Sequence, residues 1–208
     1  FRNLTLRPEM VIGSYMEGVR RRFLNPFNYL GVALALSGIS FFVMKNRVDK
    51  ISPDIMGART DTIATRKIME ISMEYHAFIF LLYIPIIALA GYLTFNTRNY
   101  NLPEHVVSAC YSLSHFSILM MPVSIFVLLA NPGNYMVYSF AVIGLMFVYT
   151  LYVLIRLHTI SGWILTLIRG IAYFFLFCIG YFGLSITINI IILLTGVVEL
   201  QDYLPQEP

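Results

Sequence analysis

The sequence predicts an all-α, polytopic membrane protein with four to five transmembrane helices and an amphipathic interfacial helix at its N-terminus. Of its 208 residues, 58% are hydrophobic and only 12% are charged, whereas soluble domains contain about 45–50% apolar and about 25% charged residues. Five apolar runs reach about 18 residues, the length that indicates a membrane-spanning helix. None alternates polar and apolar side chains as barrel strands do, and lipid admits only helices or closed barrels.

The first element is a predicted helix over residues 7–24, within an interfacial segment of residues 1–26. Pro8 suits the first turn of a helix, and apolar side chains recur every three or four residues on one face. These side chains are Ile12, Met16, Val19 and Phe23. The basic end of this helix predicts docking to anionic lipid headgroups or to a partner, through Tyr15, Arg20, Arg21 and Arg22. Between the two interpretations, we favour an anchoring helix that carries a topology signal over a specific docking site.

A transmembrane bundle is expected over residues 27–198, followed by a short acidic tail at 199–208. The predicted spans are residues 27–44, 77–95, 106–129, 135–155 and 171–198. The first is marginal in length, and the fifth is long enough that it must tilt or carry a turn outside the lipid.

Two connections have structure of their own in this prediction. The polar segment 45–76 contains a helix-start signal at Ser52-Pro53-Asp54. It continues in a helix with one apolar stripe that can run without a break into the second span. The stripe consists of Ala64, Ile68, Ile71 and Tyr75. Residues 156–169 hold an Arg at each end and the only Trp, which predicts a second interfacial helix between the fourth and fifth spans.

Basic residues leave two topologies open. If all five runs cross and the N-terminus is cytoplasmic, eight basic residues lie inside and six outside, a weak bias by the positive-inside rule. If residues 27–44 dip in and return, or pack against the bundle, eleven lie inside and three outside. The second arrangement fits the charges better and the first fits the apolar character of residues 27–44 better. We expect a cytoplasmic N-terminus in either arrangement.

The segment "NLPEHVVSACYSLSH" at 101–115 carries the candidate site. Pro103 and Glu104 suit the first turn of a helix, where an acid stabilises the helix dipole. Glu104, Ser108, Tyr111 and His115 then share one stripe at spacings of four, three and four residues, and His105 lies on an adjacent stripe. Polar side chains within a membrane face the bundle interior or a wet cavity. The stripe therefore predicts either interhelical hydrogen bonding or a ligand or proton site.

Possible partners of this stripe lie elsewhere in the chain. Asn189 lies one turn from Ser185 in the fifth span, and Arg169 could pair with Glu104 if both lie at the same membrane face. No metal-binding, nucleotide-binding or nucleophile motif is present, and Cys110 and Cys178 form no CxxC pair. We therefore expect no metal, no cofactor and no catalytic residue.

Two motifs resemble a known family. The first is "LRPEMVIGSYMEGVRRRFLNPFNYL" at 6–30, with a Tyr15, Gly18 and Arg20 core and an Asn-Pro-Phe start to the first span. The second is "YNLPEHVVSACYSLSHFSIL" at 100–119, a Tyr followed by Glu-His and a further His. Both are similar to an uncharacterised bacterial integral inner-membrane family, a domain of unknown function. Relatives often carry His at or beside the position of Tyr111, so the second motif is matched in part.

This resemblance implies a multi-pass protein of the bacterial cytoplasmic membrane without implying a mechanism. Relatives often have a zinc-ribbon-like segment ahead of the first motif, and we expect residues to precede Phe1.

The sequence favours a non-enzymatic integral membrane protein, an accessory or scaffold subunit that docks to a membrane partner. One alternative is a small transporter or channel with a polar path at Glu104, His105 and His115. Another is a membrane enzyme that acts on a lipid. The expected partners are the lipid bilayer and its anionic headgroups, together with another membrane protein or further copies of this chain, and no nucleic acid.

Overall fold

The computed structural model describes residues 1–19, 21, 23–47, 50–51, 63–158, 162–198 and 202, and the ordered elements within these ranges are helices. Two short helices come first, followed by one long helix, a shorter polar helix, and four further long helices with a 3₁₀ turn between two of them. In chain order they are α1 (Arg2–Leu6), α2 (Pro8–Met16), α3 (Pro26–Lys45), α4 (Ile63–Glu74), α5 (His76–Phe95), α6 (Leu102–Ala130), η2 (Pro132–Asn134), α7 (Tyr135–Leu157) and α8 (Trp163–Leu194).

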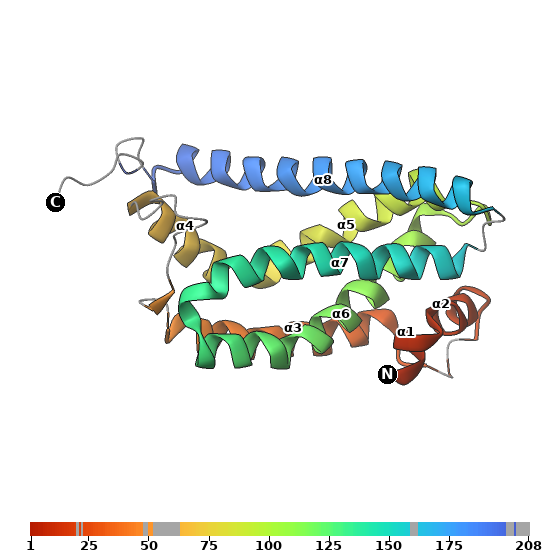
Figure 1. The fold of residues 1–208 in the computed structure, drawn as a ribbon, viewed down its shortest axis with the longest axis horizontal. Helices are drawn as coiled ribbons and strands as arrows, with labels where there is room; N and C mark the ends of the chain where they lie inside the picture. Colours follow the sequence, from red (N-terminus) through yellow and green to blue (C-terminus); the bar gives the residue numbers. More distant parts are fainter. Residues whose placement is uncertain are drawn as a thin grey trace.

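Five helices are long and apolar enough to cross a membrane, which confirms the predicted fold class. Helices α3, α6 and α8 start at the end of the bundle that carries α1 and α2, and α5 and α7 return to it (Figure 1). We call this the N-terminal end, and we call the end that carries α4 and η2 the opposite end. The first apolar run forms one continuous helix along the bundle and does not turn back, as the five-crossing arrangement requires.

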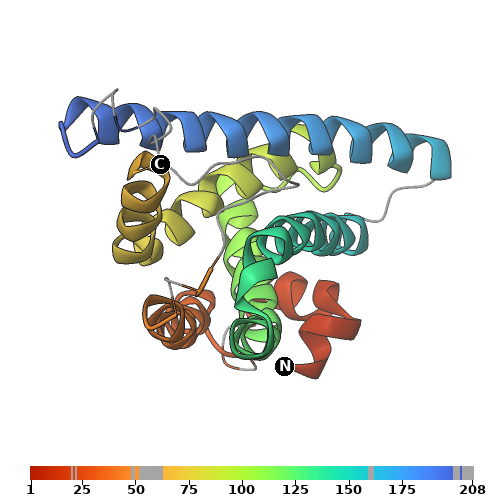
Figure 2. The same ribbon diagram turned by 60° about the vertical axis from the view of Figure 1, so that its left-hand side comes forward.

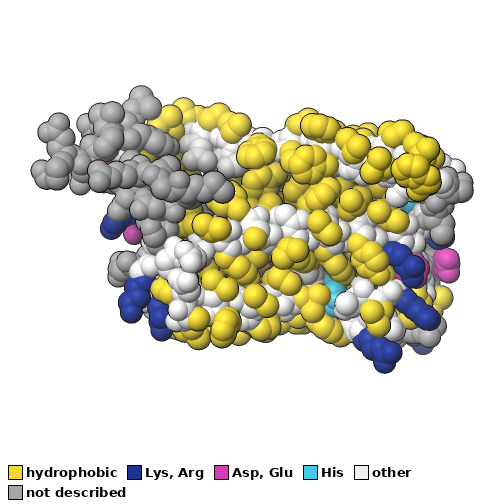
Figure 3. All heavy atoms as spheres, in the orientation of Figure 1, with side chains coloured by type: hydrophobic (Ala, Val, Ile, Leu, Met, Phe, Trp, Pro, Cys, Tyr) yellow, Lys and Arg dark blue, Asp and Glu magenta, His cyan; other side chains and the backbone are white. Residues whose placement is uncertain are grey.

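Charged side chains gather at the two ends of the face shown in Figure 3, and hydrophobic side chains cover most of the band between them. This distribution is the one a lipid layer requires, because apolar side chains are stable against acyl chains and charged ones are not. The apolar band between the charged ends is therefore the part of this face that is suited to contact with lipid.

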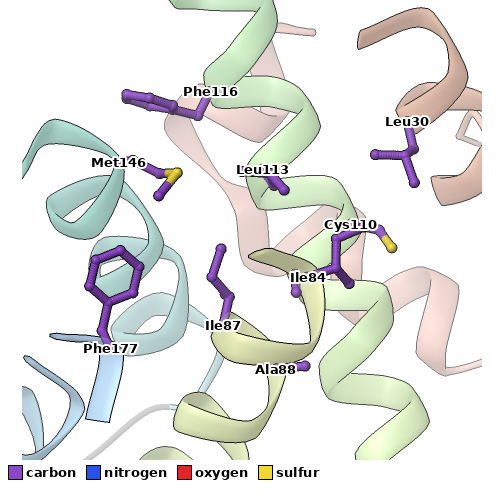
Figure 4. Close-up of a cluster of buried hydrophobic side chains, with 10 residues drawn as sticks. Leu30, Ile84, Ile87, Ala88, Cys110, Leu113, Phe116, Met146 and Phe177 are labelled. Carbon is purple, nitrogen blue, oxygen red and sulfur yellow. The ribbon is translucent and has the colours of Figure 1, made fainter. Parts of the chain in front are cut away.

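Helix α6 lies at the centre of the bundle. Every residue from Ser108 to Phe116 is buried, which no helix with a lipid-facing side could show. The main apolar cluster joins all five long helices around it (Figure 4). Its members include Leu30 from α3, Ile87 from α5, Leu113 from α6, Met146 from α7 and Phe177 from α8.

The first interfacial helix ends earlier than predicted. Helix α2 stops at Met16, because Gly18 takes a φ of +92° that a side chain would disfavour. The amide of Val19 then bonds the carbonyl of Ser14 (2.9 Å), and the amide of Gly18 bonds that of Tyr15 (3.2 Å), as in a glycine-terminated helix end. The apolar spacing that continued to Phe23 therefore did not indicate a longer helix.

Basic residues at this point are only partly described. Arg21 is exposed, and Arg20 and Arg22 lie outside the described residues. The docking role predicted for these arginines stays a prediction.

Two other element boundaries differ from the prediction. Residues 156–169 form no separate interfacial helix, because α7 runs to Leu157 and α8 already begins at Trp163. The predicted continuous helix into the second span breaks at Tyr75, which is exposed and separates α4 from α5. The Ser52-Pro53-Asp54 signal and all of the tail except Asp202 lie outside the described residues, and Cys110 and Cys178 are free thiols.

A close glycine contact tests the packing of α8 on α5. A Cβ at Gly180 would lie 2.5 Å from Cγ2 of Ile86, whereas a Cβ at Gly183 on the same helix would meet nothing within 4 Å. We expect Gly180→Ala to destabilise the folded protein by about 1–3 kcal/mol, because the two helices must separate. Thermal unfolding in detergent should show a lower midpoint for Gly180→Ala than for Gly183→Ala, and equal midpoints would contradict this packing.

Candidate functional site

The polar stripe of α6 begins with a capped helix end. The carboxylate of Glu104 accepts a hydrogen bond from the backbone amide of Asn101 at 2.7 Å. This bond satisfies one of the amides that a helix N-terminus leaves without an intrahelical partner. Glu104 forms no ion pair with Arg169 in the described structure, so its role is explained by the cap.

His115 lies at the middle of a hydrogen-bonded cluster. Its ring is fully buried. Nδ1 lies 2.7 Å from the hydroxyl of Tyr29, and Nε2 lies 2.9 Å from the hydroxyl of Thr5. A neutral imidazole has one donor and one acceptor nitrogen, so one hydroxyl donates to the ring and the other accepts from it. The ring of Phe1 covers the cluster, with its centroid 4.5 Å from that of His115.

Tyrosines of the bundle hold the N-terminal segment through its backbone carbonyls. The Tyr149 hydroxyl donates to the carbonyl of Leu4 (3.1 Å), and the Tyr152 hydroxyl lies 3.3 Å and 3.2 Å from the carbonyls of Thr5 and Leu6. These are the last carbonyls of α1, which a helix end leaves without partners. The same side chains therefore satisfy the end of α1 and fix it to α7.

Two further contacts extend this attachment. The Tyr111 hydroxyl donates to the carbonyl of Leu24 at 2.6 Å. Arg156 contacts both carboxylate oxygens of Glu9, at 2.6 Å and 3.2 Å. We call His115, Tyr111, Tyr149, Tyr152 and Arg156 the N-terminal clamp. Because the Arg156–Glu9 pair is partly exposed, water screens it. The less exposed hydrogen bonds of His115, Tyr111 and Tyr149 therefore carry most of the attachment.

A second polar group at the same end is a pair of stacked histidines. The rings of His105 and His158 lie 5.2 Å apart between centroids and are inclined by only 10°. Tyr100 presents its ring edge-on to both, and Tyr92 does so to His105. Nε2 of His105 and both nitrogens of His158 are buried without a hydrogen-bond partner. Such groups are uncommon, because an unsatisfied buried polar atom costs about 1–3 kcal/mol.

The surroundings of His158 disfavour its charged form. Burial, and to a smaller extent the neighbouring His105, Arg98 and Arg169, lower the pKa of His158 to about 3. The ring is therefore neutral at neutral pH, and its backbone carbonyl accepts a hydrogen bond from the hydroxyl of Thr97 at 2.8 Å.

The structure divides the predicted site residues among different places. Tyr111 and His115 meet in the clamp, Tyr15 packs edge-on against Tyr111, and Ser108 is buried in α6. His105 joins His158 instead. Asn189 lies towards the opposite end of the bundle, where its side chain donates to the carbonyl of Ser185 in its own helix.

Sequence reasoning named Arg156 among the possible partners of the stripe but missed the two tyrosines of α7 that belong to the clamp. Tyr149, Tyr152 and Arg156 follow one another at spacings of three and four residues on α7, a signal that could have identified a polar face. Tyr29 and Thr5 had no such signal.

The hydrogen bonds of this arrangement join helices of one chain to each other. Within the described ranges there is no group of three or more His, Cys, Asp or Glu side chains that could hold a metal ion. His115 uses both ring nitrogens in hydrogen bonds to side chains of α1 and α3. The polar stripe thus fixes the N-terminal helices to the bundle. Binding of a ligand or a proton by this stripe stays a prediction.

Residues 1–38 match a family model described as "Protein of unknown function (DUF3667)". The match includes the first of the two motifs, at 6–30, and ends before the second, at 100–119. No curated protein and no solved structure matches the chain. The similarity therefore marks the N-terminal helices and the start of α3 as the recognisable part of the sequence, without assigning an activity.

Removing the clamp hydroxyls tests the attachment of α1. In the double variant Tyr149→Phe, Tyr152→Phe, we expect the backbone amides of residues 1–16 to exchange roughly five to ten times faster than in the unaltered chain. Each lost hydrogen bond is worth about 0.6 kcal/mol in a membrane protein. Hydrogen–deuterium exchange read by mass spectrometry measures this. Tyr138→Phe is the control, because Tyr138 bonds Ser124 at the opposite end. Unchanged exchange in the double variant would contradict the clamp.

The buried histidine pair predicts sensitivity to acid. A histidine in the unfolded chain has a pKa of about 6.5, which is higher than the pKa of His158 in the folded protein. As the pH falls below about 6.5, the unfolded chain therefore binds a proton at this residue before the folded protein does. The stability that His158 contributes is therefore complete above about pH 6.5 and is lost progressively as the pH falls towards 3.

Thermal unfolding in detergent from about pH 7 to about pH 4 measures this loss. His158→Phe keeps a ring beside His105 but cannot be protonated, so its midpoint should fall less than that of the unaltered chain. His76→Phe, at the opposite end, is the control. An identical fall in the unaltered chain and in His158→Phe would rule out this contribution.

Proposed function

We propose that this chain is a non-enzymatic integral membrane protein that serves as an accessory or scaffold subunit and docks through α8 to a transmembrane helix of a partner. The observation that carries the proposal is how little of α8 the bundle covers. Only 11% of its most apolar stretch is buried, against 28–33% in the other four spans. Most of the surface of α8 is therefore not covered by the rest of the chain and is accessible to a second protein.

A shallow groove between α7 and α8 gives this docking surface a shape. It encloses about 670 Å³ at the N-terminal half of α8 and is almost wholly apolar. Its walls include Leu151 and Ile155 from α7 and Trp163, Thr166, Gly170 and Phe174 from α8. Gly162, Thr166 and Gly170 follow at intervals of four residues, and small residues at this spacing let another helix approach closely in lipid.

The same geometry gives the two alternative functions less support. A transporter or channel that uses Glu104, His105 and His115 needs water along their stripe, but His115 is fully buried and bonded at both nitrogens, and Glu104 caps its own helix. A lipid-modifying enzyme needs a second acid or base near Glu104. The neighbouring ionisable group is His105, but its ring is buried against His158, and the Glu104 carboxylate is bonded to the backbone of Asn101.

The proposal also places the protein in a membrane. Five apolar helices support an integral membrane protein, and the resemblance of its two motifs supports the bacterial cytoplasmic membrane. In the five-crossing arrangement the sequence assigns eight basic residues to the side of the N-terminus and six to the other side, which favours a cytoplasmic N-terminus by the positive-inside rule.

Filling the groove tests the docking role. Thr166 bonds only its own helix backbone, to the carbonyl of Gly162 at 3.1 Å, and Thr187 does the same, to Gly183 at 2.7 Å, outside the groove. We expect Thr166→Trp to reduce the yield of any protein that co-purifies from native membranes by about tenfold, since a blocked interface centre costs at least about 1.4 kcal/mol. Thr187→Trp should leave the yield unchanged.

Site-specific photo-crosslinking identifies the bound chain. Crosslinks from position 166 and not from 187 would support docking at the groove, and crosslinks to a second copy would make the partner another molecule of this protein. Crosslinks only to lipid from both positions would overturn the proposal.

A further inference from the structure

Three cavities adjoin one another at the opposite end of the bundle, away from the N-terminal clamp. They enclose about 630 Å³, 420 Å³ and 200 Å³. Phe41 lines all three, His76 lines the first two, and Phe80 and Tyr83 line the second and third. The walls come from α3, α4, α5 and α8, with α6 and α7 at the innermost part. Their combined size is enough for a ligand, because binding sites for small molecules enclose about 300–1,000 Å³.

The lining changes in polarity from the mouth inwards. The first cavity is bordered by charged side chains at the membrane surface, Lys45 at the end of α3 and Glu70 and Glu74 on α4. The second is lined by no charged residue, and its polar groups include Asn189 and Ser139. The third is apolar apart from hydroxyl groups. A gradient from charged to apolar matches a molecule with a charged head and an apolar tail.

The charges at the mouth are available to such a head. Lys45, Glu70 and Glu74 are all exposed, and none forms an ion pair with another described residue. The two carboxylates are four residues apart on α4, so they lie on one face of that helix. Together the three groups offer one cation for an anionic group and two anions for a cationic group.

The walls of the cavities also contain an unfilled space and a hydroxyl group without a hydrogen-bond partner. A Cβ added at Gly38 would meet nothing within 4 Å, so the backbone of α3 faces open space at the mouth. Further inside, the hydroxyl of Ser40 is buried without a hydrogen-bond partner. An ester oxygen of a bound lipid could accept from it, which would satisfy this otherwise costly group.

We propose that these cavities form a binding site for a zwitterionic phospholipid, whose phosphate contacts Lys45, whose ammonium group contacts Glu70 and Glu74, and whose acyl chain enters the bundle beside Phe41 and Tyr83. This site is separate from the groove between α7 and α8, and it does not depend on the partner proposed for α8.

Lipid retention by the full chain tests the site. The protein is purified in detergent, depleted of lipid, and offered phosphatidylethanolamine or phosphatidylglycerol at equal concentration, with bound lipid counted by native mass spectrometry. Both lipids carry the phosphate, and only the first carries the ammonium group. We expect phosphatidylethanolamine to be retained about fivefold better, because its ammonium group gains contacts with carboxylates that water screens only in part.

Two variants separate the head contact from the tail cavity. Glu70→Gln with Glu74→Gln, both on an exposed surface, should make the two lipids bind equally. Gly38→Leu should lower retention of both lipids by about tenfold, because the leucine side chain fills the mouth of the cavities. The variant should still form α3, because leucine favours a helix more than glycine does. Gly31→Leu is the matched control on α3, since a Cβ there also meets nothing within 4 Å but lies outside the cavities.

Equal retention of the two lipids by the unaltered chain would overturn the proposed headgroup contacts. Unchanged retention in Gly38→Leu, with a thermal unfolding midpoint like that of Gly31→Leu, would overturn the cavity as the site. Preferential binding of phosphatidylglycerol would overturn the proposal as a whole, because it would show that the carboxylates do not select the head.

Discussion

The hydrogen bonds between the N-terminal clamp and the first two helices are the interaction on which the arrangement of this protein depends. A bilayer offers few partners to a backbone carbonyl, so a helix as short as α1 is unfavourable unless its end is satisfied by side chains. Tyr149 and Tyr152 supply hydroxyls to these carbonyls, and His115 joins α1 to α3 through Thr5 and Tyr29. The polar edge of α6 can be buried at the centre of the bundle because these partners surround it.

Much of the fold could be predicted from apolar runs alone, because lipid demands long apolar helices. The predicted first span of 27–44 differs from Pro26–Lys45 by one residue at each end, since Pro and Lys mark both boundaries. The start of the fifth span was wrong, because Arg169 indicated a boundary, yet α8 carries this arginine half-buried in its second turn. The N-terminal helix was too long, because its apolar spacing continues past Gly18, where the backbone turns.

The site was harder to predict for a different reason. Spacing on one helix identified His115 and Tyr111 as members of one polar stripe, but their partners include backbone carbonyls, which have no sequence signature. His105 meets His158, which lies on another helix and is brought beside it only by the packing of α7 against α6. Periodicity can thus assign a face to a residue, whereas the identity of its neighbour comes from tertiary structure.

The helices of this bundle differ greatly in length. Helix α3 has 20 residues and α8 has 32, which correspond to about 30 Å and about 48 Å of helix. Figure 2, where α3 is seen nearly end-on and α8 along its length, shows that α8 is strongly inclined to α3. Acyl chains beside α3 therefore meet a wall that matches the roughly 30 Å hydrocarbon layer, while those beside α8 meet a longer, slanted one. The slant of α8 takes up its extra length, so the two flanks of the protein present helices of different slope to one bilayer.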